Sequence, residues 1–158
     1  MAKWFTTEEM CVSASYPKLV EVPEDGSQIY WNIQYTIERL DRIREEWGSP
    51  IIVTSGYRPQ KLNKAVGGSR TSAHLTGMAA DIHPKKGNIM KLAELIVNME
   101  MDFDQLILEK CTVKNGIVTD CQWLHVGCSR NRNRRQVLAW DGKGYKEVKI
   151  TRETKFSV

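Results

Sequence analysis

The stretch TSAHLTGMAADIH, residues 71–83, contains two of the chain's three histidines together with an aspartate. His74 and Asp81 lie seven residues apart, and a glycine and two alanines stand between them. One interpretation is a metal site, in which the small residues let the chain approach the ion closely. The other is a turn at Gly77 followed by a buried strand. The residues on either side are needed to decide.

On either side of this stretch, the sequence predicts helices in the first part of the chain and mostly strands after them. Apolar residues recur every three or four positions from Ile33 to Trp47, which predicts a helix of about five turns ended by Gly48. This order favours an α+β fold, with helices packed on one face of a largely antiparallel sheet. Further helices are expected at 5–10, 60–68 and 88–99, strands at 50–59, 77–83, 102–109, 116–120, 122–128, 135–140 and 145–150, and a hairpin turn at 140–145.

The bulk composition is that of a globular chain. Its 158 residues are 41% hydrophobic and 27% charged, with a net charge of +4 that favours an anionic partner. We expect one domain over 1–158, with a motif-bearing core at about 4–140 and a terminal hairpin or tail at 141–158. No apolar run approaches the ~20 residues of a membrane span. The first ten residues lack a secretory segment, so we expect synthesis in the cytoplasm.

The four cysteines, at 11, 111, 121 and 128, do not have the spacing of a four-thiolate zinc site. An even number would allow disulfides, but the absence of a secretory segment favours reduced thiols. We therefore expect them to be structural or incidental.

Alternation along the expected strands gives each of them one apolar face and one face with a polar group. Asp81 and His83 share a face, and so do Trp123, His125 and Gly127. Phe103, Gln105, Ile107 and Glu109 are expected to share a face of a third strand. If the polar faces line one cleft, His74, Asp81 and His125 converge there. Two imidazoles and one carboxylate suit zinc, because catalytic zinc sites use three protein ligands and keep a fourth position open.

Several stretches, taken together and in order, resemble the zinc D-Ala-D-Ala carboxypeptidase family, whose fold is shared with the Hedgehog signalling domain. They are VTSGYRPQKLNKAVGGSRTSAHLTGMAADI (53–82), FDQLILEK (103–110), WLHV (123–126) and NRRQVL (133–138). The resemblance is to the branch of small peptidoglycan peptidases that includes phage endolysins, and it spans roughly residues 4 to 140. The family pattern S-x-H-x-x-G-x-A-x-D followed by W-x-H falls on Ser72, His74, Gly77, Ala79, Asp81, Trp123 and His125.

The resemblance implies that His74, Asp81 and His125 bind one zinc ion. It also implies a metallopeptidase that hydrolyses stem peptides or cross-links of peptidoglycan, as a carboxypeptidase or an endopeptidase. We expect a monomer without a specific nucleic-acid partner, which reaches the cell wall after release through a lysis pore or by another export route.

The same resemblance implies that Arg58 binds a substrate carboxylate, or the substrate oxygen that becomes negative during hydrolysis. Its planar guanidinium can donate two hydrogen bonds at once. Ser72 and Gln105 are expected to hydrogen-bond the substrate, although a structural role in a turn or strand is an equal alternative. His83 lies on the side of Asp81 and either lines the pocket or faces solvent before Pro84.

The general base is less clearly marked. Several branches of the family have a glutamate three residues before the last histidine, but Gln122 occupies that position here and cannot accept a proton. Glu109 is the first candidate, because the branch of small peptidoglycan peptidases has a glutamate in this strand. Asp120 is the second candidate. If neither carboxylate serves, the domain would recognise wall peptides through zinc without cleaving them.

Two further functions stay open. Cys121 and Cys128 flank His125, which would suit a cysteine hydrolase, but no helix start lies nearby to lower a thiol pKa. The run SRNRNRRQ (129–136) has four arginines in eight residues, which can contact phosphates or anionic wall polymers. A solvated loop also explains that run, and no nucleic-acid-binding signature accompanies it.

Overall fold

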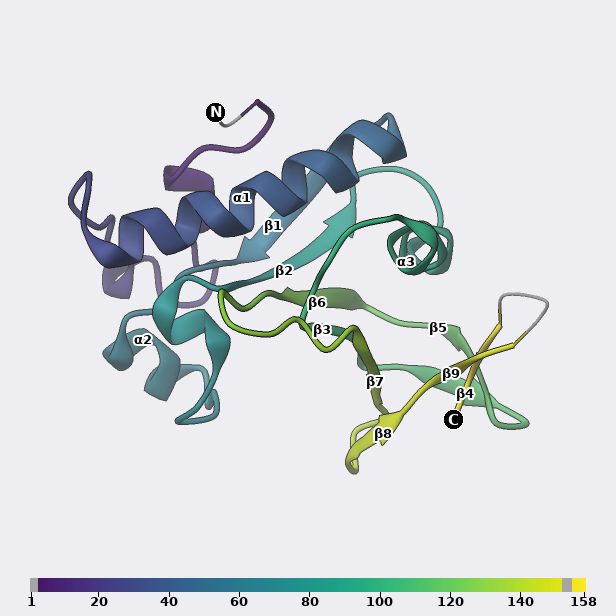
Figure 1. Ribbon diagram of the computed structural model, residues 1–158. Coiled ribbons are helices and arrows are strands. Elements are labelled where there is room, and N and C mark those ends of the chain that lie inside the picture. The colour runs from purple at the N-terminus through teal and green to yellow at the C-terminus, as the bar shows by residue number, and fades with distance from the viewer. Residues whose placement is uncertain (1–2, 152–154) are drawn as a thin grey trace.

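The computed structural model describes residues 3–151 and 155–158, and its main sheet has six strands in the order β1-β2-β6-β3-β7-β8 (Figure 1). β3 and β7 are parallel, and the other neighbouring pairs are antiparallel. The prediction of a largely antiparallel sheet is therefore confirmed. The bounds are β1 Ile51–Ser55, β2 Ala79–Pro84, β3 Gln105–Glu109, β6 Trp123–Gly127, β7 Gln136–Trp140 and β8 Tyr145–Glu147.

The last part of the chain links this sheet to a smaller one. β7 and β8 form a hairpin in which Trp140 lies opposite Tyr145. The Asp141 carboxylate accepts hydrogen bonds from two backbone N–H groups of the turn, which confirms the turn expected at 140–145. Beyond β8 the chain enters a four-stranded sheet of order β4-β5-β10-β9. Its strands are β4 Thr112–Lys114, β5 Ile117–Asp120, β9 Lys149–Ile150 and β10 Phe156–Ser157.

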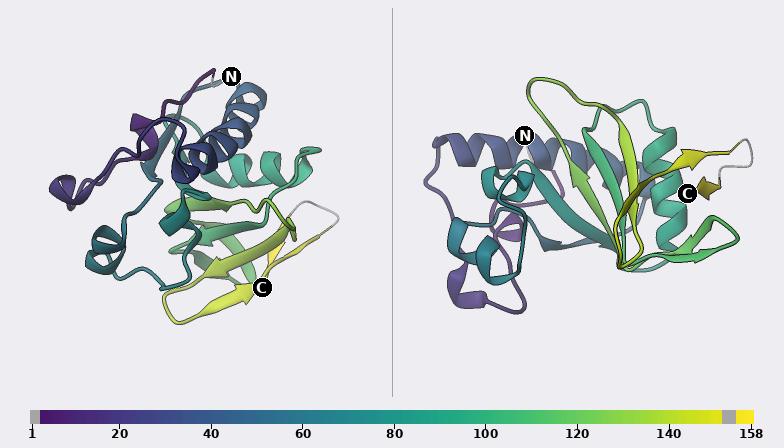
Figure 2. Two further views of the ribbon diagram at one scale, coloured as in Figure 1. Left: turned by 60° about the vertical axis from the view of Figure 1, so that its left-hand side comes forward. Right: turned by 90° about the horizontal axis from the view of Figure 1, so that it is seen from below.

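The two long helices, α1 (Gln28–Trp47) and α3 (Ile89–Asn98), lie on the same face of the six-stranded sheet (Figures 1 and 2). α1 begins after Ser27, whose side chain accepts a hydrogen bond from a backbone N–H of the first turn. It ends at Gly48, whose φ of 74° is favourable for glycine. Asn88 caps α3 in the same way as Ser27 caps α1. Both helices confirm the amphipathic patterns of the sequence.

The core lies between these helices and the sheet. Burying one leucine or isoleucine side chain contributes about 1.5–3 kcal/mol, so this layer supplies much of the folding energy and fixes β2 and β6 from one side. Its fully buried members include Ile33, Ile37, Leu40 and Ile43 of α1, Leu92, Ala93 and Ile96 of α3, and Ala80, Ile82, Leu124 and Val126 of the sheet.

Short helices occupy the remaining part of the chain. The Thr6 and Glu9 side chains bond each other's backbone N–H, as expected for a capping box. α2 and η3 lie below β2 in the view of Figure 1, beside the face that α1 leaves open. No helix in the described ranges is long and apolar enough to cross a bilayer. The short helices are η1 Glu8–Met10, η2 Pro17–Leu19, α2 Gln60–Ala65 and η3 Ala73–Thr76.

The prediction of which residues share one face of β3 is wrong for the first of them, Phe103. Phe103 was predicted to lie on the side of Gln105 and Glu109, but β3 begins only at Gln105. Phe103 is instead buried in the core, and the Arg135 guanidinium lies 4.6 Å from its ring centroid. Alternation holds only within an extended strand, and burial of a large ring decides the position of a residue just outside it.

Candidate metal centre

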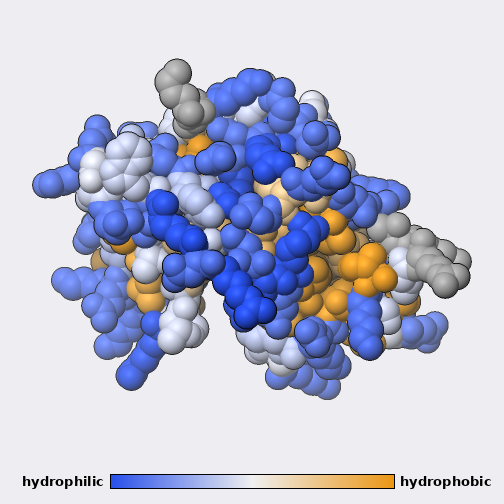
Figure 3. Space-filling model, in the orientation of Figure 1, coloured by the Kyte–Doolittle hydropathy of each residue, from blue (hydrophilic) through white to orange (hydrophobic). Residues whose placement is uncertain are grey.

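The strand pair β2–β6 places an aspartate and a histidine side by side. Asp81 lies directly opposite His125 in the antiparallel register, so both side chains project from the same face. The residues between them in sequence, such as Ile82 and Leu124, belong to the core on the other face. Asp81 and His125 therefore project from the face opposite α1. The surface has a notch between the α2 region and the β7–β8 hairpin (Figure 3).

A short 3-10 turn, η3, supplies the second histidine. The Ser72 side chain accepts a hydrogen bond from the backbone N–H of His74 and so begins η3. Gly77 ends it with a φ of 78°, and a Cβ at this position would lie 2.9 Å from Cγ1 of Ile33. Only glycine therefore turns the chain here from η3 into β2. This turn brings His74 over the strand that carries Asp81.

The three side chains meet at three atoms. Nε2 of His74 lies 3.2 Å from Oδ1 of Asp81 and 3.2 Å from Nδ1 of His125, and the remaining pair is 3.3 Å apart. Tetrahedral ligands with bonds of about 2.0–2.1 Å to zinc stand roughly 3.3–3.4 Å from one another. The three atoms therefore already have the separations of three corners of a zinc site.

The hydrogen bonding of His74 shows why a cation fits here. Its Nδ1 lies 2.7 Å from the carbonyl oxygen of Gly56 and must donate a proton to it. Burial lowers the pKa of His74, although Asp81 acts in the opposite direction, and this favours the neutral ring. Nε2 then directs a lone pair at the Asp81 carboxylate. A bound cation would convert this repulsion into two coordinate bonds.

The carboxylate itself is kept ionised. Burial alone would raise the pKa of Asp81, but the neighbouring His74 and His125 outweigh it and hold that pKa well below its usual range. Among the described residues, these three form the group of histidine, cysteine and acidic side chains placed to share an ion. Gly127 leaves room beside them, since a Cβ there would stand 3.2 Å from Nε2 of His125.

Arg58 lies at the edge of this group. Its backbone N–H donates to the carbonyl of His74 at 2.8 Å, and Nη2 donates to Oγ of Ser72 at 3.3 Å. Its Nε is buried without a hydrogen-bond partner. Burial lowers the pKa of Arg58, and the charge of Asp81 opposes this change. Arg58 therefore keeps unused donors close to the carboxylate, whereas Ser72 is largely occupied in holding η3 and Arg58.

Glu109, at the end of β3, is the acidic side chain of that strand nearest to the group. It lies opposite Trp123, two residues from His125 along β6. Burial raises the pKa of Glu109, His125 lowers it, and Asp81 raises it. The Tyr145 hydroxyl of β8 also lowers the pKa of Glu109, which on balance is raised. Tyr145 was not recognised from the sequence, because the register that brings β8 here is a tertiary feature.

The other predicted site residues lie away from the three converging side chains or are already hydrogen-bonded to another residue. The Gln105 amide donates to Oε1 of Gln136 at 2.7 Å, a partner that the sequence did not indicate. His83 and Asp120 line a different hollow of about 410 Å³, together with Gln122. None of the three converging residues lines that hollow. The backbone carbonyl of Gly56 was also missed, since main-chain acceptors carry no sequence signal.

The structure gives little support to a cysteine nucleophile. All four cysteines are free. Burial raises the pKa of the Cys121 thiol to about 12 and also raises that of Cys128. Because only a thiolate attacks efficiently, neither thiol is prepared for catalysis near neutral pH.

The arginine run is mainly bonded within the protein. Arg130 donates to Asn32 and to a backbone carbonyl of α1, and Arg134 binds Asp104 through two nitrogens. Arg135 donates to the carbonyls of Met101 and Val97 and lies over an aromatic ring. These contacts fasten the loop before β7 to the rest of the fold.

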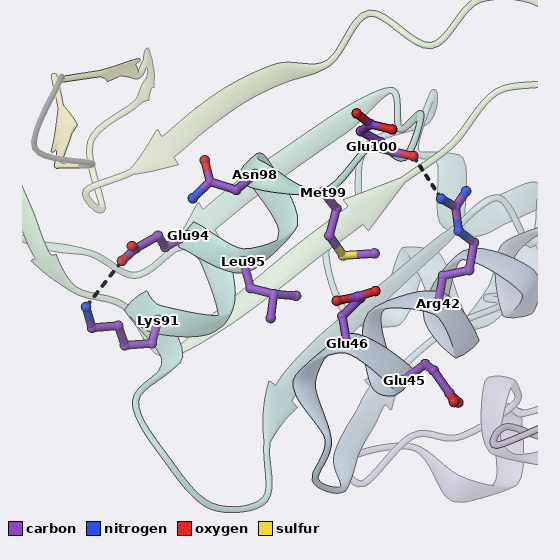
Figure 4. Close-up of a pocket in the computed structure, with 9 residues that line it drawn as sticks. All are labelled: Arg42, Glu45, Glu46, Lys91, Glu94, Leu95, Asn98, Met99 and Glu100. Carbon is purple, nitrogen blue, oxygen red and sulfur yellow. Dashed lines mark hydrogen bonds and ion pairs between the residues drawn. The ribbon is translucent and has the colours of Figure 1, made fainter.

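A hollow of about 670 Å³ between α1 and α3 offers a further place for a ligand (Figure 4). Arg42 donates to the carbonyl of Glu100, and Lys91 pairs with Glu94. Its lining has neither histidine nor cysteine, and it lies between the helices that cover the opposite face of the sheet. It therefore offers neither a thiol nucleophile nor an imidazole base.

Comparison with known proteins agrees with this geometry. A family model described as Peptidase M15 matches residues 3–127. The matched range contains the three converging residues together with Arg58 and Glu109, and it ends before β7 and β8. A search of curated proteins finds no match.

Proposed function

Because the chain belongs to the peptidase M15 family, we propose that it is a zinc peptidase that hydrolyses peptide bonds of bacterial peptidoglycan. The observation that carries the zinc assignment is the triangle of His74, Asp81 and His125 atoms, with edges of 3.2–3.3 Å. The family supports peptide hydrolysis. The cell-wall substrate rests on the motifs shared with zinc D-Ala-D-Ala carboxypeptidases.

In this proposal each side chain near the triangle has one task. Zinc would polarise the peptide carbonyl and activate water near neutral pH. Glu109 would accept the proton of the attacking water and deliver it to the leaving amine. Arg58 would donate its free N–H groups to the oxygen that becomes negative as the tetrahedral carbon forms. Asp120 is the second candidate for the base, but it lies around the hollow of His83.

The arrangement of the chain around the triangle is compatible with an extended substrate. The notch between the α2 region and the β7–β8 hairpin is open to solvent in Figure 3. We propose that residues 141–158 belong to the same domain, since β8 pairs with β7 and β10 pairs with β5. The net charge of +4 suits an anionic cell wall, which the enzyme would reach after export or lysis.

The proposal is tested by digesting purified peptidoglycan with the protein and analysing the soluble fragments by mass spectrometry. We expect new peptide fragments with the zinc-loaded protein, none after chelation, and recovery when zinc is added back. The His125→Ala variant serves as the control for contaminating activity. Equal cleavage by rigorously metal-free protein would contradict the zinc mechanism.

One observation favours a second candidate function. Gln122 stands where several branches of the family have a glutamate, and an amide cannot accept a proton. If Glu109 does not serve as base, the domain would recognise wall peptides through zinc without cutting them. Zinc-dependent binding of soluble peptidoglycan fragments, with no new fragments after long incubation, would identify this function.

A further inference from the structure

The hairpin β7–β8 brings an aromatic residue to the candidate centre from outside the range that the family model matches. That range ends at residue 127, whereas Tyr145 begins β8 at the edge of the main sheet. Its side chain is 56% exposed, which is high for an aromatic residue in a strand. This exposed aromatic ring stands at the same end of the sheet as Glu109, the carboxylate proposed as the general base.

The strand register explains how Tyr145 reaches Glu109. The parallel pairing of β3 and β7 places Leu108 beside Ala139, and Glu109 and Trp140 are the next and last residues of these two strands. Trp140 in turn lies opposite Tyr145 across the hairpin. The Trp140 and Tyr145 rings stand 4.7 Å apart between centroids. Glu109, Trp140 and Tyr145 therefore lie at the same end of three neighbouring strands.

The two side chains act on each other electrostatically: the Tyr145 hydroxyl lowers the pKa of Glu109, and the Glu109 charge raises the pKa of the phenol. A phenol that donates to a carboxylate makes a charge-assisted bond, stronger than one between neutral groups. The charges of Asp81 and Arg58 also act on this hydroxyl, so the phenol lies within electrostatic reach of the candidate centre. The ring pair with Trp140 restricts the movement of the phenol, so a hydrogen bond from its hydroxyl would also restrict the carboxylate.

We propose that Tyr145 is a positioning residue for the hydrolysis: its hydroxyl donates to the Glu109 carboxylate and holds it aimed at the substrate water. The β7–β8 hairpin, which carries Trp140 and Tyr145, borders the notch on the side opposite the α2 region (Figure 3). This inference rests on the proposed function and extends it to a segment beyond the family match. Tyr145 acts through Glu109 and does not itself transfer the proton.

The first test removes only the hydroxyl, in Tyr145→Phe, and measures peptidoglycan cleavage by the zinc-loaded protein. We expect kcat to fall on the order of 10-fold, in keeping with the loss of one hydrogen bond to a charged group. KM and bound zinc should change by less than about twofold, since ring and metal ligands are retained. Tyr30→Phe, on α1 across the sheet, is the matched control and should be unchanged.

A double-mutant cycle distinguishes positioning of Glu109 from a general structural effect. In a Glu109→Gln background, adding Tyr145→Phe should lower kcat by less than about twofold. An unchanged kcat in the single variant, or a full additional loss in the double variant, would overturn the proposal.

A readout independent of catalysis keeps this inference separate from the proposed function. The ultraviolet titration of Tyr145 is obtained as the difference between the parent protein and Tyr145→Phe. Burial and the Glu109 charge both raise the pKa of this phenol, so Glu109→Gln should lower it, with the other tyrosines unaffected. An unshifted phenol would show that the contact is absent. Absence of cleavage by the parent protein with a shifted phenol would instead reject the peptidase function alone.

Discussion

The two faces of β2 and β6 are built from alternate residues of the same strands, yet they serve opposite purposes. On the covered face Ile82 and Leu124 are 0% exposed and pack against the helices. On the other face Asp81 and His125 meet His74 with their polar atoms 3.2–3.3 Å apart. The covered face supplies folding energy through apolar burial. The polar face gathers lone pairs that only a cation satisfies fully, and the rigid covered face keeps them together.

The largest expected effect breaks the polar face alone. Asp81→Asn replaces a charged ligand by a neutral amide, so zinc should bind at less than one equivalent per chain. The kcat/KM for peptidoglycan should fall about 10³-fold or more. Metal content by mass spectrometry and the digestion assay measure both results. Asp25→Asn in an exposed loop is the matched control, and a fully zinc-loaded, active Asp81→Asn protein would remove Asp81 from the centre.

The next effect separates the two acidic candidates for the base. Glu109→Gln should lower kcat by about 10²–10⁴-fold while zinc stays bound, because a proton acceptor is lost and the ligands are intact. Asp120→Asn should leave kcat nearly unchanged, since Asp120 lies with His83 around another hollow. Steady-state kinetics of the two zinc-loaded variants measure the difference. The reverse pattern would transfer the role to Asp120.

The covered face should respond in the opposite way. Leu124→Ala leaves a cavity one residue away from His125, and the free energy of unfolding should fall by about 3 kcal/mol, within the usual 2–5 kcal/mol. The activity of the molecules that stay folded should be close to that of the parent. Urea unfolding and kinetics below the transition test this. A loss smaller than about 1 kcal/mol would mean that the core tolerates the cavity and the contrast between faces is weaker.

The smallest expected effect concerns the ion pair between Arg134 and Asp104, which lies just before β3 and β7 begin. Arg134 binds the Asp104 carboxylate and holds its pKa below the usual range. Because the folded pKa is lowered, the pair stabilises the protein above the unfolded pKa of about 3.9 and loses this contribution as pH falls through the folded value. The pair is partly exposed, so Arg134→Gln should cost no more than about 1 kcal/mol at neutral pH.

Urea unfolding of the parent and Arg134→Gln at neutral pH and at about pH 2 measures this dependence. The difference between the two proteins should close at the lower pH. A difference that stays constant with pH would show that Arg134 acts through packing rather than charge. Arg132→Gln is the matched control from the same loop.

Local patterns predicted much of this molecule. The spacing from Ile33 to Trp47 predicted α1, and the turn residues 140–145 predicted the β7–β8 hairpin. Period-two alternation placed Asp81 and His125 on the polar sides of their strands. Each of these features depends on neighbours within a few residues, so the sequence carries the necessary information.

Local sequence patterns did not predict the register between strands that are far apart in the chain. The parallel pairing of β3 with β7 brings Gln136 to Gln105, and the β7–β8 hairpin then places Tyr145 at the end of the sheet that carries Glu109. Nothing near either residue in the sequence indicates these partners. Alternation also extended Phe103 into a strand face that it does not join, because burial in the core outweighs the period of a strand that has not yet begun.

The sequence alone was enough to select the candidate residues for the chemistry: two imidazoles, a carboxylate and an arginine, in motifs whose order resembles that of the family. How these side chains meet follows from the folded chain, in which His74 bonds the Gly56 carbonyl and the strand order β3-β7-β8 brings Tyr145 to the end of the sheet that carries Glu109. The physical reason is that residue type and local period are encoded within a few positions. Distances between side chains depend instead on how the whole sheet and its covering helices pack.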